Sequence, residues 1–151
     1  MRNLFDANAV TEIRARVEAL TMRNERKWGR MNVAQAVAHC SGGFQLAMGE
    51  IRPPRASFPG RILGRIIKPL IFGDDKPMRR NSPTVDDILI RGERELDAER
   101  RRLLGMIDRF VDAGPAGCTR HAHSFFGRLT PQEWAILMYK HMDHHLRQFG
   151  G

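Results

Sequence analysis

The chain has 151 residues, 42% of them hydrophobic and 28% charged, and a formal net charge of +8. This size and composition are typical of one soluble domain with a hydrophobic core, and they exclude a disulfide framework or a low-complexity chain. The arginines are spread over every segment and mixed with acidic residues, and aromatic residues are few. This pattern favours a solvated surface over a nucleic-acid partner.

The two cysteines, Cys40 and Cys118, are far apart and predict no disulfide, so a reducing cytoplasm is the simplest setting. The first residues show no signal-peptide pattern. The longest apolar run, residues 62–72, is interrupted by a glycine, a proline and two cations. It is too short and too broken to span a bilayer, so we expect a cytoplasmic protein without a membrane partner.

Two helices are predicted in the first third of the chain. The first begins between residues 6 and 8 and carries apolar residues at three- and four-residue steps. The second follows Asn32, a favoured N-cap residue, and extends to about Met48. His39 lies beside a flank of small residues on this helix, so the helical wheel leaves open whether it is structural or a ligand. Gln35, one turn earlier, is positioned to orient it.

Residues 49–83 form the least regular region, since six of the eight prolines lie there. Within this region, Arg61–Phe72 is basic and apolar and is compatible with a short helix. We expect it to be a lid or crossover packed on the other helices rather than a segment lying on a membrane.

A third helix is predicted to follow Ser82-Pro83-Thr84 and to run to about Asp112. Glu99 lies on its apolar stripe, where a carboxylate is costly unless it is paired. Glu99 is therefore a candidate partner of a metal ligand or a candidate general base. The alternative is that it reaches solvent or an arginine.

The predicted helix at residues 130–149 carries the clearest chemical signal. Thr130 is a suitable N-cap, and the proline and glutamate after it complete a helix-start pattern. His141 and His145 are one turn apart, on the face that also carries Trp134 and Met138. Two inward imidazoles at this spacing can bind one metal ion, as in a His-Glu-x-x-His helix, although that motif's glutamate is missing here. The alternative is a pair of histidines bonded to backbone carbonyls.

The opposite face of this helix is expected to meet solvent. Ile136 is an apolar exception on that side, suited to contact with a partner, and His144 lies at the edge of the inward face. The polar residues of the outer face are Gln132, Lys140, Asp143 and Arg147.

Just before this helix, His121 and His123 alternate, so they share a side in an extended segment. They are candidates for a ligand, for an acid or base near the metal, or for a helix cap.

Four helical patterns without a convincing strand predict an all-α four-helix bundle, with residues 1–151 as a single domain. In such a bundle His39 could converge with the two histidines of the last helix.

Three segments carry a resemblance to a known family: WGRMNVAQAVAH from Trp28, HSFFGRLT from His123 and YKHMDHHLRQF from Tyr139. They occur in the expected order and span most of the chain. On these motifs the chain resembles the DinB/YfiT-like superfamily of metalloenzymes, within a branch described mainly as proteins of unknown function. This chain has His123-Ser124 where that branch usually has His-Pro.

The resemblance implies an up-and-down four-helix bundle with a long crossover between its second and third helices, often as a homodimer. It implies a divalent metal, commonly nickel or zinc, held by His39, His141 and His145, with His144 beside the site or structural. Relatives in the superfamily include transferases and isomerases that use low-molecular-weight thiols.

We therefore expect a metal-dependent enzyme with a small-molecule substrate, either a thiol-dependent S-transferase or a hydrolase. Its catalytic residues are left open, with Glu99, His123 and His144 as candidates. The alternative is a non-catalytic metal- or ligand-binding bundle protein in a stress or damage response. A nucleic-acid binder that relies on net charge is the third reading.

Overall fold

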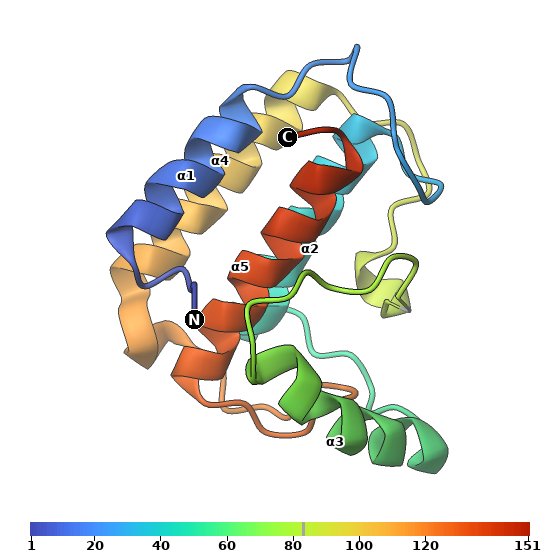
Figure 1. Ribbon diagram of the computed structural model, residues 1–151, viewed down its shortest axis with the longest axis vertical. Coiled ribbons are helices and arrows are strands. Elements are labelled where there is room, and N and C mark those ends of the chain that lie inside the picture. Colours follow the sequence, from blue (N-terminus) through green and yellow to red (C-terminus); the bar gives the residue numbers. More distant parts are fainter. Residues whose placement is uncertain (83) are drawn as a thin grey trace.

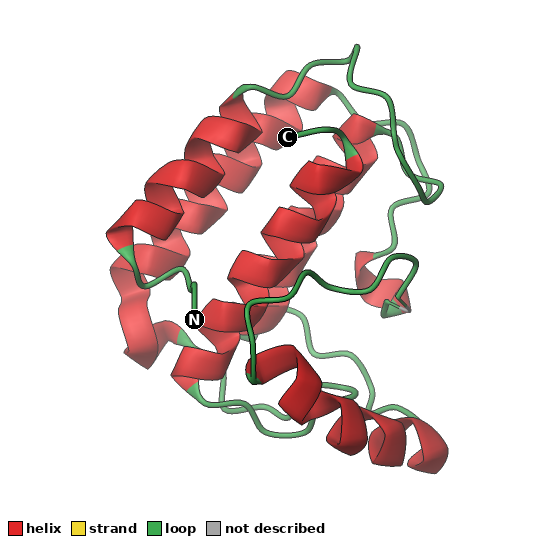
Figure 2. Ribbon diagram, in the orientation of Figure 1, coloured by secondary structure: helices red, strands yellow, loops and turns green. Residues whose placement is uncertain are grey.

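The computed structural model describes residues 1–82 and 84–151. In these residues the chain forms five α-helices and two short 3₁₀ turns, with loops but no β-strand between them (Figure 2). The fold class is therefore all-α, as the sequence predicts. The helices are α1 Ala7–Glu18, α2 Val33–Met48, α3 Phe58–Phe72, α4 Leu96–Ala113 and α5 Pro131–Gln148, and the 3₁₀ turns are η1 Asp86–Ile88 and η2 Gly114–Gly117.

Three helices begin at the caps that the sequence predicts. The Asp6 side chain accepts hydrogen bonds from the first backbone N–H groups of α1. Asn32 and Thr130 each form a capping box at the start of α2 and α5. Each cap satisfies N–H groups that have no partner inside the helix, which fixes where the helix starts.

α1, α2, α4 and α5 pack around one core, with α1 and α5 in one layer and α4 and α2 in the layer behind (Figure 1). α2 contacts α4 and α5, and α1 contacts the same two helices. α1 and α5 run in one direction while α2 and α4 run in the opposite one (Figure 1). The core buries large side chains such as Trp134, Phe44 and Phe110, and removal of this apolar surface from water is the main term that favours the folded state.

The helix predicted from residue 84 begins only at Leu96, so the predicted start was wrong. Pro83, which that prediction included, lies outside the described residues. The preceding segment instead forms η1, whose buried Ile88 packs on α2 at Gly42. A Cβ on Gly42 would lie only 2.7 Å from Ile88 Cγ2. The contact between Ile88 and Gly42, together with the low helix propensity of Gly92, outweighs the helical apolar period of the residues before Leu96.

α5 is buried on nearly all sides, which the sequence did not predict. Ile136, Lys140 and Asp143 were assigned to a solvent face, yet they are 6%, 5% and 7% exposed. α1 and the segment after α3 cover this face: Arg16 pairs with Asp143, and Lys140 donates to the Asp74 carbonyl. Ile136 is thus buried within the chain, and its predicted contact with a partner was wrong.

α3 contains the basic, apolar segment Arg61–Phe72 and lies apart from the other four helices (Figure 1). One of its faces packs on the rest of the protein. Lys68 forms an ion pair with Glu133 of α5 at 2.9 Å, and Gly64 lies so close to the Phe125 carbonyl that a Cβ would be 2.1 Å from its oxygen. None of the helices described has the length and apolar character needed to cross a membrane.

Candidate metal centre

Three histidines from two helices meet in the structure. His39 comes from the middle of α2, and His141 and His145 come from the second half of α5. Nε2 of His39 lies 3.0 Å from Nε2 of His141, and each of the three residues offers a ring nitrogen within 4.8 Å of the others. The structure therefore brings together the three residues that the sequence singled out as metal ligands.

Two neighbouring glycines of α2 allow this convergence. A Cβ on Gly43 would lie 2.8 Å from His141 Nδ1, so a larger residue there would displace the ring. Gly42 performs the same role for Ile88. The small-residue flank noticed beside His39 is thus where the ring of His141 and the η1 segment approach α2 most closely.

A backbone carbonyl fixes the tautomer of His39. The His39 ring is 3% exposed, and its Nδ1 lies 2.8 Å from the Ile88 carbonyl oxygen. Because a carbonyl can only accept, Nδ1 carries the proton and Nε2 has a free lone pair. Gln35, which the sequence suggested for this role, instead completes the capping box with Asn32 and donates to the Gly92 carbonyl, so that prediction was wrong.

A side-chain amide fixes the tautomer of His145 in the same way. Gln148 Nε2 donates to the Trp28 carbonyl at 2.7 Å, which turns Gln148 Oε1 toward His145. His145 Nδ1 lies 2.8 Å from that oxygen and therefore donates to it, again leaving Nε2 with a lone pair. Gln148 was not predicted from the sequence, although its position three residues after His145 was an available signal. The Ile88 carbonyl had no such signal.

All three rings are neutral near pH 7. Burial is the main cause that lowers the pKa of His39, of His141 and of His145, the last to about 3. A neighbouring histidine adds to the effect in each case, because two imidazolium ions at this distance repel each other. Neutral imidazole is the form that binds a metal ion.

The donor set fits a divalent cation. Two imidazole nitrogens on a tetrahedral ion at ~2.0–2.1 Å lie roughly 3.3 Å apart, close to the 3.0 Å between His39 and His141. Metal-binding histidines usually donate their second N–H to an oxygen, as His39 and His145 do here. Imidazole ligands suit zinc, nickel, copper and iron, and three ligands leave a position open for another molecule.

The three candidate catalytic residues occupy different places. The Glu99 side chain on α4 is 13% exposed and lies 3.6 Å from Arg94 and 3.5 Å from Arg102, in ion pairs that do not involve the histidines. His144 lies at the rim of the site, with its ring edge-on to Trp28 at 5.5 Å. Burial lowers its pKa.

His123 lies near His141 but outside the cluster. Its Nδ1 accepts hydrogen bonds from the Phe125 and Phe126 backbone N–H groups, so it stabilises the turn before α5. Burial lowers the pKa of His123 to about 4, which keeps the ring neutral. His121 is exposed and does not join the three histidines.

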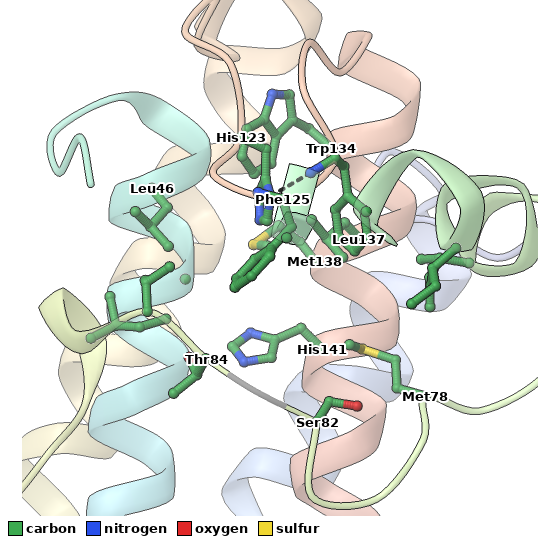
Figure 3. Close-up of a pocket in the computed structure, with 18 of the residues that line it drawn as sticks. Leu46, Met78, Ser82, Thr84, His123, Phe125, Trp134, Leu137, Met138 and His141 are labelled. Carbon is green, nitrogen blue, oxygen red and sulfur yellow. Dashed lines mark hydrogen bonds between the residues drawn. The ribbon is translucent and has the colours of Figure 1, made fainter. Parts of the chain in front are cut away.

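Two cavities meet at His141. One, here called the histidine chamber, is about 220 Å³ and contains all three clustered histidines together with Trp28 and Arg30. The other, the apolar chamber, is about 210 Å³ and lies between α3, α2 and α5. Figure 3 shows the ring of His141 facing this second chamber. The cluster can thus be approached from two chemically different sides.

A cationic cleft adjoins the histidine chamber. Its volume is about 270 Å³, and it shares Trp28 and His144 with that chamber. Three cations line it, Lys27, Arg80 and Arg147, of which Arg147 is paired with Asp143 at 2.7 Å. Arg80 stacks on the Trp28 ring at 4.3 Å, and the cleft's lining residues include no carboxylate. An anion is therefore the ligand that this cleft favours.

Comparison with known proteins gives a family but no activity. No curated protein and no solved structure matches the chain. One family model matches residues 2–150, which is nearly the whole chain. The chain belongs to this family, which is described as a protein of unknown function (DUF1569).

Proposed function

We propose that the chain is a divalent-metal-dependent enzyme of the DinB/YfiT-like superfamily, with nickel or zinc held by His39, His141 and His145. One observation carries this proposal: two of the three clustered rings donate Nδ1–H to fixed oxygens, so their Nε2 lone pairs point into the cluster, where Nε2 of His39 lies 3.0 Å from Nε2 of His141.

The proposed fold is the four-helix bundle of that superfamily, formed by α1, α2, α4 and α5, with the long crossover between α2 and α4. The contacts of α2 with α4 and α5, and of α1 with the same two helices, form a closed ring that supports this fold.

We propose the reducing cytoplasm as the location of the protein, and the free thiols of Cys40 and Cys118 are compatible with it.

The proposed reaction is transfer of a thiol to an electrophilic carbon. When bound, a divalent cation lowers the pKa of a thiol or a water molecule, so that a nucleophile forms near neutral pH. In the overall reaction the thiol loses its proton, a sulfur–carbon bond forms, and the carbon releases its leaving group with the bonding electrons.

The surroundings of the cluster support transfer between two molecules more than hydrolysis of one. Lys27 and Arg80 would bind an anionic low-molecular-weight thiol on one side. The apolar chamber on the other side would hold the electrophile and exclude water.

Elemental analysis tests the metal site directly. Protein purified without a His-tag or added metal should contain about one divalent ion per chain, and His145→Ala should lose it. His121→Ala is the matched control, since His121 is exposed and outside the cluster. No metal in the wild type, even after soaking with nickel or zinc, would contradict the proposal.

Turnover then separates an enzyme from a binding protein. Conjugation of 1-chloro-2,4-dinitrobenzene with glutathione should be accelerated by the wild type and by His121→Ala, but not by His145→Ala. Full metal occupancy without turnover on any thiol or ester of a substrate panel would instead favour the non-catalytic binding protein.

A further inference from the structure

The walls of the apolar chamber come from three helices, from described residues between 78 and 88, and from the turn at residues 123–126. α3 contributes its inner face, while α2 and α5 contribute the opposite walls. The aliphatic side chains among its lining residues are Leu46, Leu63, Ile67, Ile71, Met78, Val85, Ile88, Leu137 and Met138. Water gains little in such a cavity, because a water molecule needs two to four polar partners.

α3 is held at a fixed distance above the chamber. Gly64 touches the Phe125 carbonyl so closely that α3 cannot move further inward. Lys68 ties the same helix to α5 through Glu133 and to the loop before α5 through the Arg128 carbonyl. Among the described helices α3 packs mainly on α5, so it covers the chamber without filling it.

The two ends of the chamber differ in polarity. Figure 3 shows His123, Phe125 and Trp134 gathered at one end, while Ser82 and Thr84 lie at the other. His141 faces the space between them, nearer to the two hydroxyl side chains (Figure 3). A ligand that matches this gradient has an apolar body and one polar end that meets His141.

The chamber is open to solvent at its rim. Leu63 of α3 lines it although this residue is 56% exposed, and Ser82, across from α3, is exposed as well. A small molecule can therefore enter between α3 and the segment at residue 82 without unfolding of the core.

We propose that the apolar chamber binds the hydrocarbon body of the electrophilic substrate, a single aromatic ring or a short alkyl chain. Its volume of about 210 Å³ is below the roughly 300–1,000 Å³ of pockets for drug-sized ligands and above a ~150 Å³ apolar cavity that binds benzene. The role of the polar end rests on the proposed function, whereas occupation of the chamber by hydrocarbon does not.

Toluene tests the chamber alone, because it has no group that binds a metal. Calorimetric titration of the purified protein should show saturable binding of one toluene per chain. Leu63→Trp should weaken this binding at least about tenfold, because its ring fills the mouth of the chamber. Ile66→Trp is the matched control, since Ile66 is also exposed on α3 but does not line the chamber, and it should bind toluene like the wild type.

Linear alkyl hydroxamates test the polar end, because the hydroxamate group chelates a divalent cation. From acetohydroxamate upward, affinity should rise about fourfold for each methylene until the chamber is full. Leu63→Trp should abolish this rise, and Ile66→Trp should keep it. His145→Ala should lose hydroxamate binding yet still bind toluene.

The outcomes are distinguishable. Equal toluene affinity in Leu63→Trp and the wild type, or no saturable binding, would overturn the proposal. Hydroxamate affinities independent of chain length would also overturn it, because the body would then bind elsewhere. Toluene binding without any hydroxamate binding would support the chamber and refute the proposed metal site.

Discussion

Two faces of α5 carry polar side chains that are buried or half-buried, but the partners of these side chains differ. On the face toward α1, each charged group has a partner of the opposite kind. On the face toward α2, the outer nitrogens of His39 and His145 bond to fixed oxygens, while the inner nitrogens of the cluster face one another, with Nε2 of His39 3.0 Å from Nε2 of His141, beside two cavities. A buried polar group whose partners are complete therefore has a structural role. A cluster whose inner nitrogens have only one another as neighbours points to a binding site.

The paired face forms an ion network. Asp143 accepts a hydrogen bond from Arg16 of α1 at 2.9 Å and one from Arg147 at 2.7 Å. Lys140 donates to the Asp74 carbonyl at 2.5 Å, and burial lowers the pKa of its ammonium group. These contacts join α1 and the segment after α3 to α5, so this face should govern stability rather than chemistry.

Asp143→Ala should give the largest loss of stability without loss of metal. The side chain of Asp143 is 9% exposed and that of Arg16 is 18% exposed, so removal of the carboxylate leaves a mostly buried cation with one partner fewer. We expect the free energy of unfolding to fall by about 3 kcal/mol, measured by urea denaturation.

Asp108→Ala is the control for this variant. Asp108 also pairs with an arginine of α1, Arg14, but its side chain is 55% exposed. Its loss should cost under about 1 kcal/mol. Metal content should stay at the wild-type level in both variants, and a loss of metal in Asp143→Ala would show that the two faces are not independent.

The sequence predicts the histidine face well because its residues depend on one helix. The period of α5 places His141 and His145 beside Trp134 and Met138, and the last two are indeed 2% and 4% exposed. The caps at Asn32 and Thr130 are likewise local patterns, so they were readable without knowledge of the tertiary fold.

The paired face was not predictable in the same way. A helical wheel reports which residues share a side, but not that α1 and residues 73–76 cover the polar side as well. The carbonyl that orients His39 belongs to Ile88, in a segment whose apolar period wrongly predicted helix. Long-range packing on Gly42 determines that segment, and no local pattern encodes such a contact.

Gln148 lies on the histidine side of α5 and tests whether an orienting partner controls metal affinity. Gln148→Ala removes the acceptor of the His145 Nδ1–H and should weaken metal binding about 10- to 100-fold, since loss of an orienting partner has effects of this size. Gln132→Ala, an exposed glutamine on the same helix, should not change it. Competition with a chromogenic chelator measures both affinities.

Gln148→Glu separates orientation from packing. A carboxylate keeps the acceptor for His145 but loses the N–H that reaches the Trp28 carbonyl. Metal affinity should therefore recover to near the wild-type value in this variant. If it stays as low as in Gln148→Ala, the glutamine acts by holding Trp28 rather than by orienting the histidine.

His123 should give the smallest effect, which appears as a pH dependence of stability. Burial lowers the pKa of His123 to about 4 in the folded chain, against roughly 6.5 when unfolded. Between these values the unfolded chain binds the proton and the folded chain does not, so His123 contributes stability above about pH 6.5 that is lost as the pH falls toward 4. From pH 7 to pH 5, wild type should therefore lose about 1–2 kcal/mol more than His123→Asn in urea denaturation. Equal losses would show that His123 can take up a proton in the folded chain, and so that its ring is less enclosed than the contacts with Phe126 and Trp134 indicate.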